Sequence, residues 1–148
     1  MPLTRALAAW LVILTLAIAN GALREAVLIP MLGARAGLVS SGIALSLAVL
    51  LVAFALARLT PGLTVRQGAR IGALWLVLTL AFEFTFGRLV AHKAWSELFA
   101  AYTFEGGNLW PVVLLVTLLS PIIAVRTGGT ILRQPDITPH SRSTPTSS

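Results

Sequence analysis

Four long apolar blocks decide what this chain can fold into. About 20 mostly apolar residues cross the ~30 Å hydrocarbon core of a bilayer as a helix, because each residue adds ~1.5 Å. Lipid offers the backbone no hydrogen-bond partner, so such blocks must be helical. We therefore predict an all-α integral membrane protein, a bundle of four transmembrane helices within residues 1–125. The expected spans cover about residues 6–23, 38–57, 71–88 and 109–125.

The composition of the chain fits a membrane protein better than a soluble one. Of its 148 residues, 57% are hydrophobic and 11% are charged, and the mean hydropathy is +0.89. Soluble domains carry about 25% charged residues. We therefore expect the lipid bilayer to surround the bundle. The chain has no cysteine, which excludes disulfides, thiol chemistry and cysteine-ligated metals.

The basic residues predict an orientation. The net charge is +6, but the Lys and Arg residues lie between the apolar blocks or in the tail, so we expect no nucleic-acid partner. With four spans, one side holds seven of them: Arg5, Arg58, Arg66, Arg70, Arg126, Arg133 and Arg142. The other side holds four: Arg24, Arg35, Arg88 and Lys93. Because Lys and Arg accumulate on the cytoplasmic side, both termini are predicted to be cytoplasmic.

The tryptophans fall where this orientation would place aromatic belts. Trp10 and Trp75 lie near the predicted inner ends of the first and third spans. Trp95 and Trp110 lie on the predicted outer side. Tryptophan is enriched at both membrane–water interfaces, so the pattern predicts interfacial positions for these four side chains.

The first apolar block has a second interpretation. Arg5, an apolar run and then Ala17-Ile18-Ala19 are similar to a signal peptide with a small-residue cleavage site. Cleavage after Ala19 would leave three helices. The apolar run is longer than the apolar region of an ordinary signal peptide, which favours a retained helix.

The segment before the fourth block predicts a short amphipathic helix on the outer side. Apolar residues recur in it at helical spacing: Ala91, Trp95, Leu98, Phe99 and Tyr102. Such a helix would lie on the outer membrane surface or cap the bundle, between the third and fourth spans. The alternative is a continuation of the third helix beyond the membrane.

The tail over residues 126–148 changes composition. It is rich in Ser, Thr, Pro and Gly and has little apolar content. Such a segment buries too little surface to offset the entropy of ordering it. We therefore predict a disordered cytoplasmic tail.

One acidic residue inside a span marks the candidate site. Glu83 lies about 7–8 Å below Arg88, and Asn20 about 6 Å below Arg24, if both arginines are at the outer interface. If the first and third helices are neighbours, a polar cluster forms there from Asn20, Arg24, Glu25, Glu83, Arg88 and His92. The cluster could bind a charged ligand or relay a proton. Alternatively, Arg24 or Arg88 neutralises Glu83 and the cluster is a structural clamp.

Motifs for catalysis or metal binding are missing from the sequence. We find no HExxH, P-loop or G-x-S-x-G pattern, and His92 has no neighbour at a metal-ligand spacing. We therefore expect no catalytic residues, no metal and no cofactor. Gly68 with Gly72, and Gly42 with Ser46, are instead pairs of small residues that allow close helix packing within one chain or between chains.

Four segments resemble a family of small four-helix bacterial inner-membrane proteins of uncharacterised function. They are NGALRE at 20–25, LIPMLG at 28–33, FEFTFGR at 82–88 and LWP at 109–111. The resemblance implies a bacterial inner membrane and four helices, and it implies no activity.

Size, missing catalytic motifs and small-residue helix faces favour a non-enzymatic accessory or interaction subunit. Its partner would be another membrane protein or a second copy of the chain. The alternative is a small oligomeric transporter or channel with Glu83 as its intramembrane coupling residue. An enzyme using Glu83, Arg24 and His92 is the third hypothesis.

Overall fold

The computed structural model describes residues 2–131, and this part of the chain is helical without any strand. Four helices are long and apolar enough to cross a membrane, as predicted. The first is built from α1 (Leu3–Leu23), a π-helical turn η1 (Arg24–Leu28) and α2 (Ile29–Leu32). The others are α3 (Ala34–Leu59), α4 (Val65–Leu89) and α6 (Trp110–Ile131). Two short elements join α4 to α6, namely α5 (Trp95–Ala100) and the 3₁₀ turn η2 (Glu105–Gly107).

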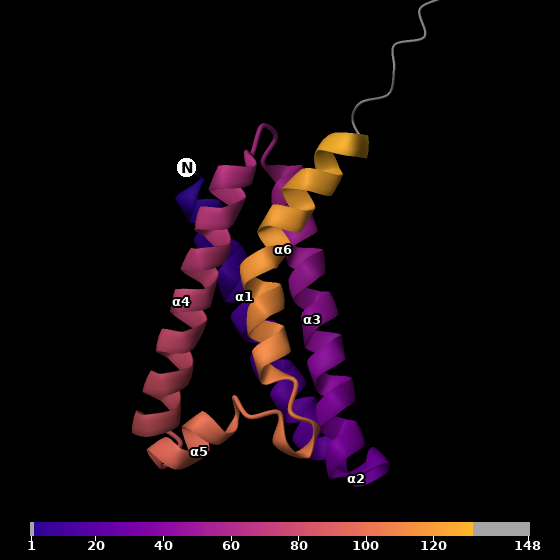
Figure 1. Cartoon of the computed structure of the whole chain (residues 1–148), viewed down its shortest axis with the longest axis vertical. Helices are drawn as coiled ribbons and strands as arrows, with labels where there is room; N and C mark the ends of the chain where they lie inside the picture. The colour runs from indigo at the N-terminus through magenta and orange to yellow at the C-terminus, as the bar shows by residue number, and fades with distance from the viewer. Residues whose placement is uncertain (1, 132–148) are drawn as a thin grey trace, which may run out of the picture.

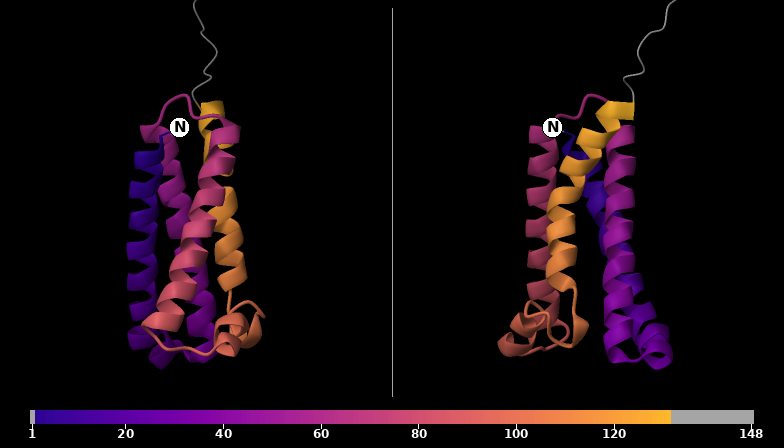
Figure 2. Two further views of the ribbon diagram at one scale, coloured as in Figure 1. Left: turned by 90° about the vertical axis from the view of Figure 1, so that its left-hand side faces the viewer. Right: turned by 45° about the vertical axis from the view of Figure 1, so that its right-hand side comes forward.

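The long helices run side by side in alternating directions (Figures 1 and 2). The start of α1, the α3–α4 turn and the end of α6 lie together at one end of the bundle. We call the other end, which holds α2 and α5, the α5 end. This arrangement agrees with four crossings, since the residues predicted to be outside gather at the α5 end.

The first helix continues well beyond its predicted end. We expected it to stop near residue 23, ahead of Pro30, but the helix passes through η1 and ends at Leu32. In η1 the Ile29 N–H donates to the Arg24 carbonyl, the wider spacing of a π-turn, and Pro30 follows in the first turn of α2. Gly33 then reverses the chain with a φ of 86°, a conformation that glycine adopts without steric cost.

The other helices also extend past the apolar blocks. α4 begins at Val65 instead of residue 71, because Thr64 and Gln67 form a capping box with N–H···O distances of 3.0 and 3.2 Å. The first turns of α4 are polar, so a hydropathy criterion misses them. α6 continues to Ile131, into the segment predicted to be a disordered tail, and residues 132–148 lie outside the described part.

Glycines bring the backbones of α4 and α6 together. A Cβ atom at Gly68 would lie 3.0 Å from the Pro121 carbonyl oxygen, and one at Gly72 would overlap the Leu118 carbonyl. The prediction of a close-packing pair at these glycines is confirmed, within one chain. At Gly42 of α3 an added Cβ atom would lie 2.7 Å from the Cβ atom of the Leu109 side chain.

Two tryptophans join α1 to α4 at the end opposite α5. The Trp75 indole N–H donates to the Ala6 carbonyl at 2.8 Å, and that of Trp10 donates to the Thr79 hydroxyl at 3.2 Å. The Trp75 side chain is 0% exposed, so its ring faces the interior of the bundle, and the interfacial depth predicted for it stays a prediction. The ring packs into the bundle, where its only polar group bonds to a backbone carbonyl.

The outside of the bundle is apolar. Large exposed side chains on the long helices include Leu11, Ile18, Leu47, Leu51, Val77 and Leu115. A surface of this kind is expected where lipid replaces water around a helical bundle.

Candidate functional site

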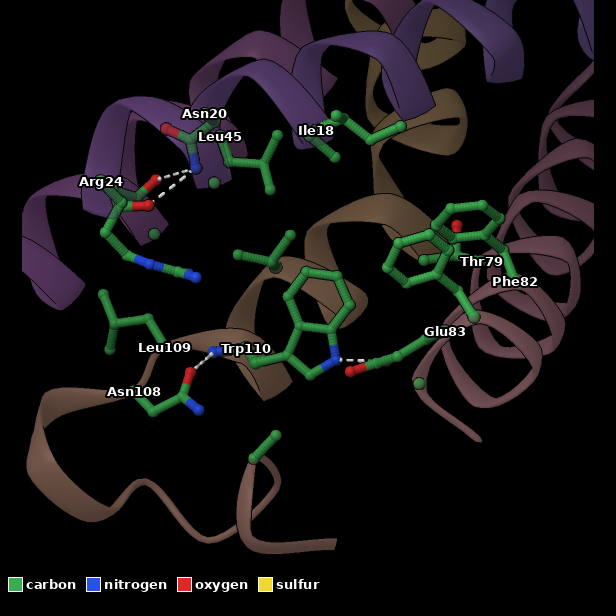
Figure 3. A pocket seen from close by; sticks show the side chains of 18 of the residues that line it. Ile18, Asn20, Arg24, Leu45, Thr79, Phe82, Glu83, Asn108, Leu109 and Trp110 are labelled. Carbon is green, nitrogen blue, oxygen red and sulfur yellow. Dashed lines mark hydrogen bonds between the residues drawn. The ribbon is translucent and has the colours of Figure 1, made fainter. Parts of the chain in front are cut away.

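A cavity of about 380 Å³ lies between the long helices toward the α5 end (Figure 3). α4 diverges from α6 in this direction, and the connection through α5 and η2 spans the gap (Figure 1). The walls are mainly apolar, with side chains that include Ile13, Ala17, Leu45, Phe82, Phe86 and Val113. Polar side chains from five segments also line it: Asn20, Arg24, Ser41, Thr79, Glu83, Lys93, Asn108 and Trp110.

Glu83 is held by donors from the α4–α6 connection and from α6. Its Oε2 atom accepts hydrogen bonds from the Tyr102 hydroxyl at 2.9 Å and from the Trp110 indole N–H at 2.7 Å. Lys93 lines the same cavity, and its positive charge acts favourably on the carboxylate. Within residues 2–131 both hydrogen bonds go to Oε2, so Oε1 remains available as an acceptor.

Asn20 and Arg24 line the opposite wall, one helical turn apart. The Asn20 amide donates to the Ser41 hydroxyl at 2.7 Å and to the Ser41 carbonyl at 3.2 Å, which ties α1 to α3. The Arg24 Nε donates to Glu25 at 3.0 Å. In Figure 3 the Arg24 guanidinium and the Glu83 carboxylate approach Trp110 from opposite sides of the cavity.

Three of the six predicted site residues do not line this cavity. Glu25 lies beside Arg24 with its side chain 66% exposed. Arg88 donates to the Lys93 carbonyl at 2.8 Å and lies 5.2 Å from the centre of the Trp95 ring. His92 is exposed, with a φ of 50°. The cavity therefore brings together Asn20, Arg24 and Glu83 only.

The partners of Glu83 differ from those considered for a clamp. Arg24 and Arg88 make the other contacts described above, and Tyr102 and Trp110 hold the carboxylate. Sequence reasoning missed both donors. It assigned Tyr102 to the apolar face of a helix and Trp110 to a membrane interface, because periodicity carries no information about a partner 19 or 27 residues away.

Aromatic and aliphatic side chains fix the connection over α4. Leu98 of α5 is buried against Gly87, where a Cβ atom would lie 2.5 Å from it. Phe84 stacks on Tyr102 with ring centres 6.2 Å apart and also contacts Trp95 and Phe99 of α5. These contacts position the Tyr102 hydroxyl beside Glu83.

Tyr102 is expected to ionise only in strong alkali. Burial, followed by the charge of Glu83 and the hydrogen bond to it, raises the pKa of Tyr102 to about 12. Because this value lies above the ordinary ~10, the neutral Tyr102 side chain stabilises the folded protein. This contribution is complete below pH ~10 and is lost as the pH rises through about 12. The chain has one tyrosine, so phenolate absorbance reports its titration directly. Glu83→Gln should lower the midpoint, and a wild-type midpoint near 10 would contradict the geometry.

Comparisons of the chain with protein-family models, curated proteins and solved structures find no match. Among residues 2–131, no group of three or more His, Cys, Asp or Glu side chains is placed to hold a metal ion. The site must therefore be interpreted from its own geometry.

Proposed function

We propose that this chain is a non-enzymatic, multi-pass protein of the bacterial inner membrane that binds a small molecule in the cavity between its helices. The α5 end would face outward, with α5 as a short amphipathic cap, and both termini would be cytoplasmic. The distribution of Lys and Arg and the family resemblance support this placement. In this proposal the chain is an accessory subunit that holds the small molecule for a partner membrane protein.

The observation that carries the proposal is the composition of the cavity wall. A volume of about 380 Å³ is within the ~300–1,000 Å³ range of small-molecule sites. Such sites combine apolar walls with a few convergent polar groups, as this cavity does with Arg24 and Glu83. An ionisable residue inside a span is costly and commonly functional. The π-turn at Arg24 adds to this, since π-turns recur at functional sites.

The arrangement favours binding over catalysis. His92, the one histidine near the predicted site, does not line the cavity. Glu83 therefore has no imidazole beside it with which to exchange a proton. The small-residue faces are also used inside the chain, where Gly68, Gly72 and Gly42 contact α6 or the residue before it. A homo-oligomer would need other surfaces.

Filling the cavity tests the proposal. Ala17 lines it, whereas Ala19 lies on the exposed side of the same helix. Native mass spectrometry of protein purified from membranes should show a bound small molecule in the wild type. The molecule should be absent from Ala17→Phe and retained by the matched control Ala19→Phe, and both variants should elute as folded protein in size-exclusion chromatography. An empty wild type, or equal occupancy in Ala17→Phe, would refute binding in this cavity.

One observation supports the transporter alternative. Glu83 lines the cavity, and its Oε1 atom accepts none of the hydrogen bonds described above, so this atom could carry a proton. Proteoliposomes under a membrane potential should then acidify with wild-type protein and not with Glu83→Gln. Equal proton fluxes with the two proteins would exclude a coupling role for Glu83.

A further inference from the structure

We infer that the cavity takes a single-chain amphiphile whose head group carries an oxyanion and a protonated amine. This inference rests on the proposed function and adds the chemical class of the ligand. The inference is based on the oppositely charged side chains of Arg24 and Glu83 and on the apolar wall of the cavity.

Arg24 provides the oxyanion subsite. Its Nε atom is fixed by Glu25 at 3.0 Å, and within the described residues this is its one hydrogen bond, so the terminal nitrogens are available. The guanidinium lies over the cavity in Figure 3. A guanidinium binds phosphate or carboxylate through two parallel N–H···O bonds, which makes it suited to an oxyanion. Lys93 adds a second positive charge to the lining.

Glu83 provides the amine subsite. Tyr102 and Trp110 donate to Oε2, which fixes the orientation of the carboxylate and leaves Oε1 to accept from a ligand. A primary ammonium has three N–H donors and no acceptor, so it matches this atom. Glu83 and Arg24 line opposite sides of the same cavity, so a head group bound between them would direct its amine to Glu83 and its oxyanion to Arg24.

The lining favours a head group with both charges over one with a single charge, and its apolar part favours an alkyl chain. A head group with only an oxyanion would leave the Oε1 atom of Glu83 without a donor, and one with only an amine would leave the terminal nitrogens of Arg24 without an acceptor. Each singly charged head group therefore gives up one charge-assisted hydrogen bond that a head group with both charges can make. Apolar side chains of α1, α4 and α6 form most of the wall, including Ile13, Ala17, Phe82, Phe86 and Val113. They match one alkyl chain, and the volume is too small for a whole two-chain lipid.

Four probes separate these features. They are dodecyl phosphoethanolamine, dodecyl phosphate, dodecylamine and phosphoethanolamine without a chain. Each is titrated against the purified wild-type protein and Ala17→Phe by native mass spectrometry. We expect the zwitterionic amphiphile to bind at least about tenfold more tightly than each of the other probes. Dodecyl phosphate and dodecylamine each lose one hydrogen bond to a charged group, and phosphoethanolamine loses the burial of the alkyl chain. Ala17→Phe should abolish this binding.

Two variants assign the charges. Arg24→Gln should weaken the zwitterionic amphiphile and dodecyl phosphate by about tenfold or more and leave dodecylamine unchanged. Glu83→Gln should weaken the zwitterionic amphiphile and dodecylamine and leave dodecyl phosphate unchanged or tighter. Glutamine still accepts from Tyr102 and Trp110, so the fold is retained. Arg35→Gln, at the same end but outside the cavity, is the control and should change no affinity.

The outcomes distinguish the inference from the function beneath it. If a singly charged amphiphile binds in the cavity as tightly as the zwitterion, the head-group assignment is wrong and binding stands. If phosphoethanolamine without a chain binds equally well, the ligand is a soluble zwitterion and the amphiphile is wrong. If no probe distinguishes the wild type from Ala17→Phe, both the inference and small-molecule binding fail.

Discussion

Gly72→Ala is expected to destabilise the protein by about 2–3 kcal/mol, although the same change in a helix usually stabilises by up to ~1 kcal/mol. The added methyl group would overlap the Leu118 carbonyl, which belongs to the backbone of α6. A side chain could move aside, but a backbone carbonyl inside a helix cannot move without separating α4 from α6. Thermal unfolding in detergent, followed by size-exclusion chromatography, measures the effect.

Alanine substitutions at two other glycines, Gly68 and Gly128, should change the stability by different amounts. At Gly68 the added atom would be 3.0 Å from the Pro121 oxygen, so Gly68→Ala should destabilise less than Gly72→Ala. Gly128 of α6 has no atom within 4 Å of the added position, so Gly128→Ala should stabilise. If Gly72→Ala stabilised as Gly128→Ala does, the close packing of α4 on α6 would be wrong.

The spans were predictable because their signal is local. A run of apolar residues long enough to cross a bilayer needs no knowledge of its neighbours, and the i,i+4 glycines of α4 need only the helix period. The ends of the spans were less predictable. The capping box at Thr64 begins α4 in polar sequence. The π-turn carries the first helix past residue 23, where its span was predicted to end.

Half of the site was also predictable from local sequence. Depth along a helix can be counted in residues, so Asn20, Arg24 and Glu83 were expected at one level and they do line one cavity. The donors to Glu83 depend on how the α4–α6 connection folds back. Phe84 stacks on Tyr102, and Leu98 packs on Gly87, contacts that no periodicity predicts.

Trp75 shows what a composition rule leaves out. Its place in the sequence fits an interfacial belt, yet the ring is buried and its N–H donates to Ala6. The belt rule describes where tryptophan is enriched, and it carries no information about a tertiary contact that satisfies both the ring and its N–H.

If lipid covers the exposed apolar side chains, a cysteine placed among them should not react with a water-soluble thiol reagent, whereas a cysteine at either end of the bundle should. The chain has no cysteine, so a single one can be introduced anywhere without a background signal. Leu47, near the middle of α3, is 56% exposed in the isolated bundle. Ser96 of α5 and Pro61 of the α3–α4 turn are exposed at opposite ends. If the bundle spans a membrane, lipid covers Leu47 and water reaches the other two.

The most direct test of the account labels Leu47→Cys, Ser96→Cys and Pro61→Cys in intact bacteria with a membrane-impermeant maleimide. We expect Ser96→Cys to react at once, Pro61→Cys only after the cells are permeabilised, and Leu47→Cys under neither condition. The reverse order for Ser96→Cys and Pro61→Cys would overturn the orientation. Labelling of Leu47→Cys at the rate of Ser96→Cys would contradict the central claim that these helices cross a membrane.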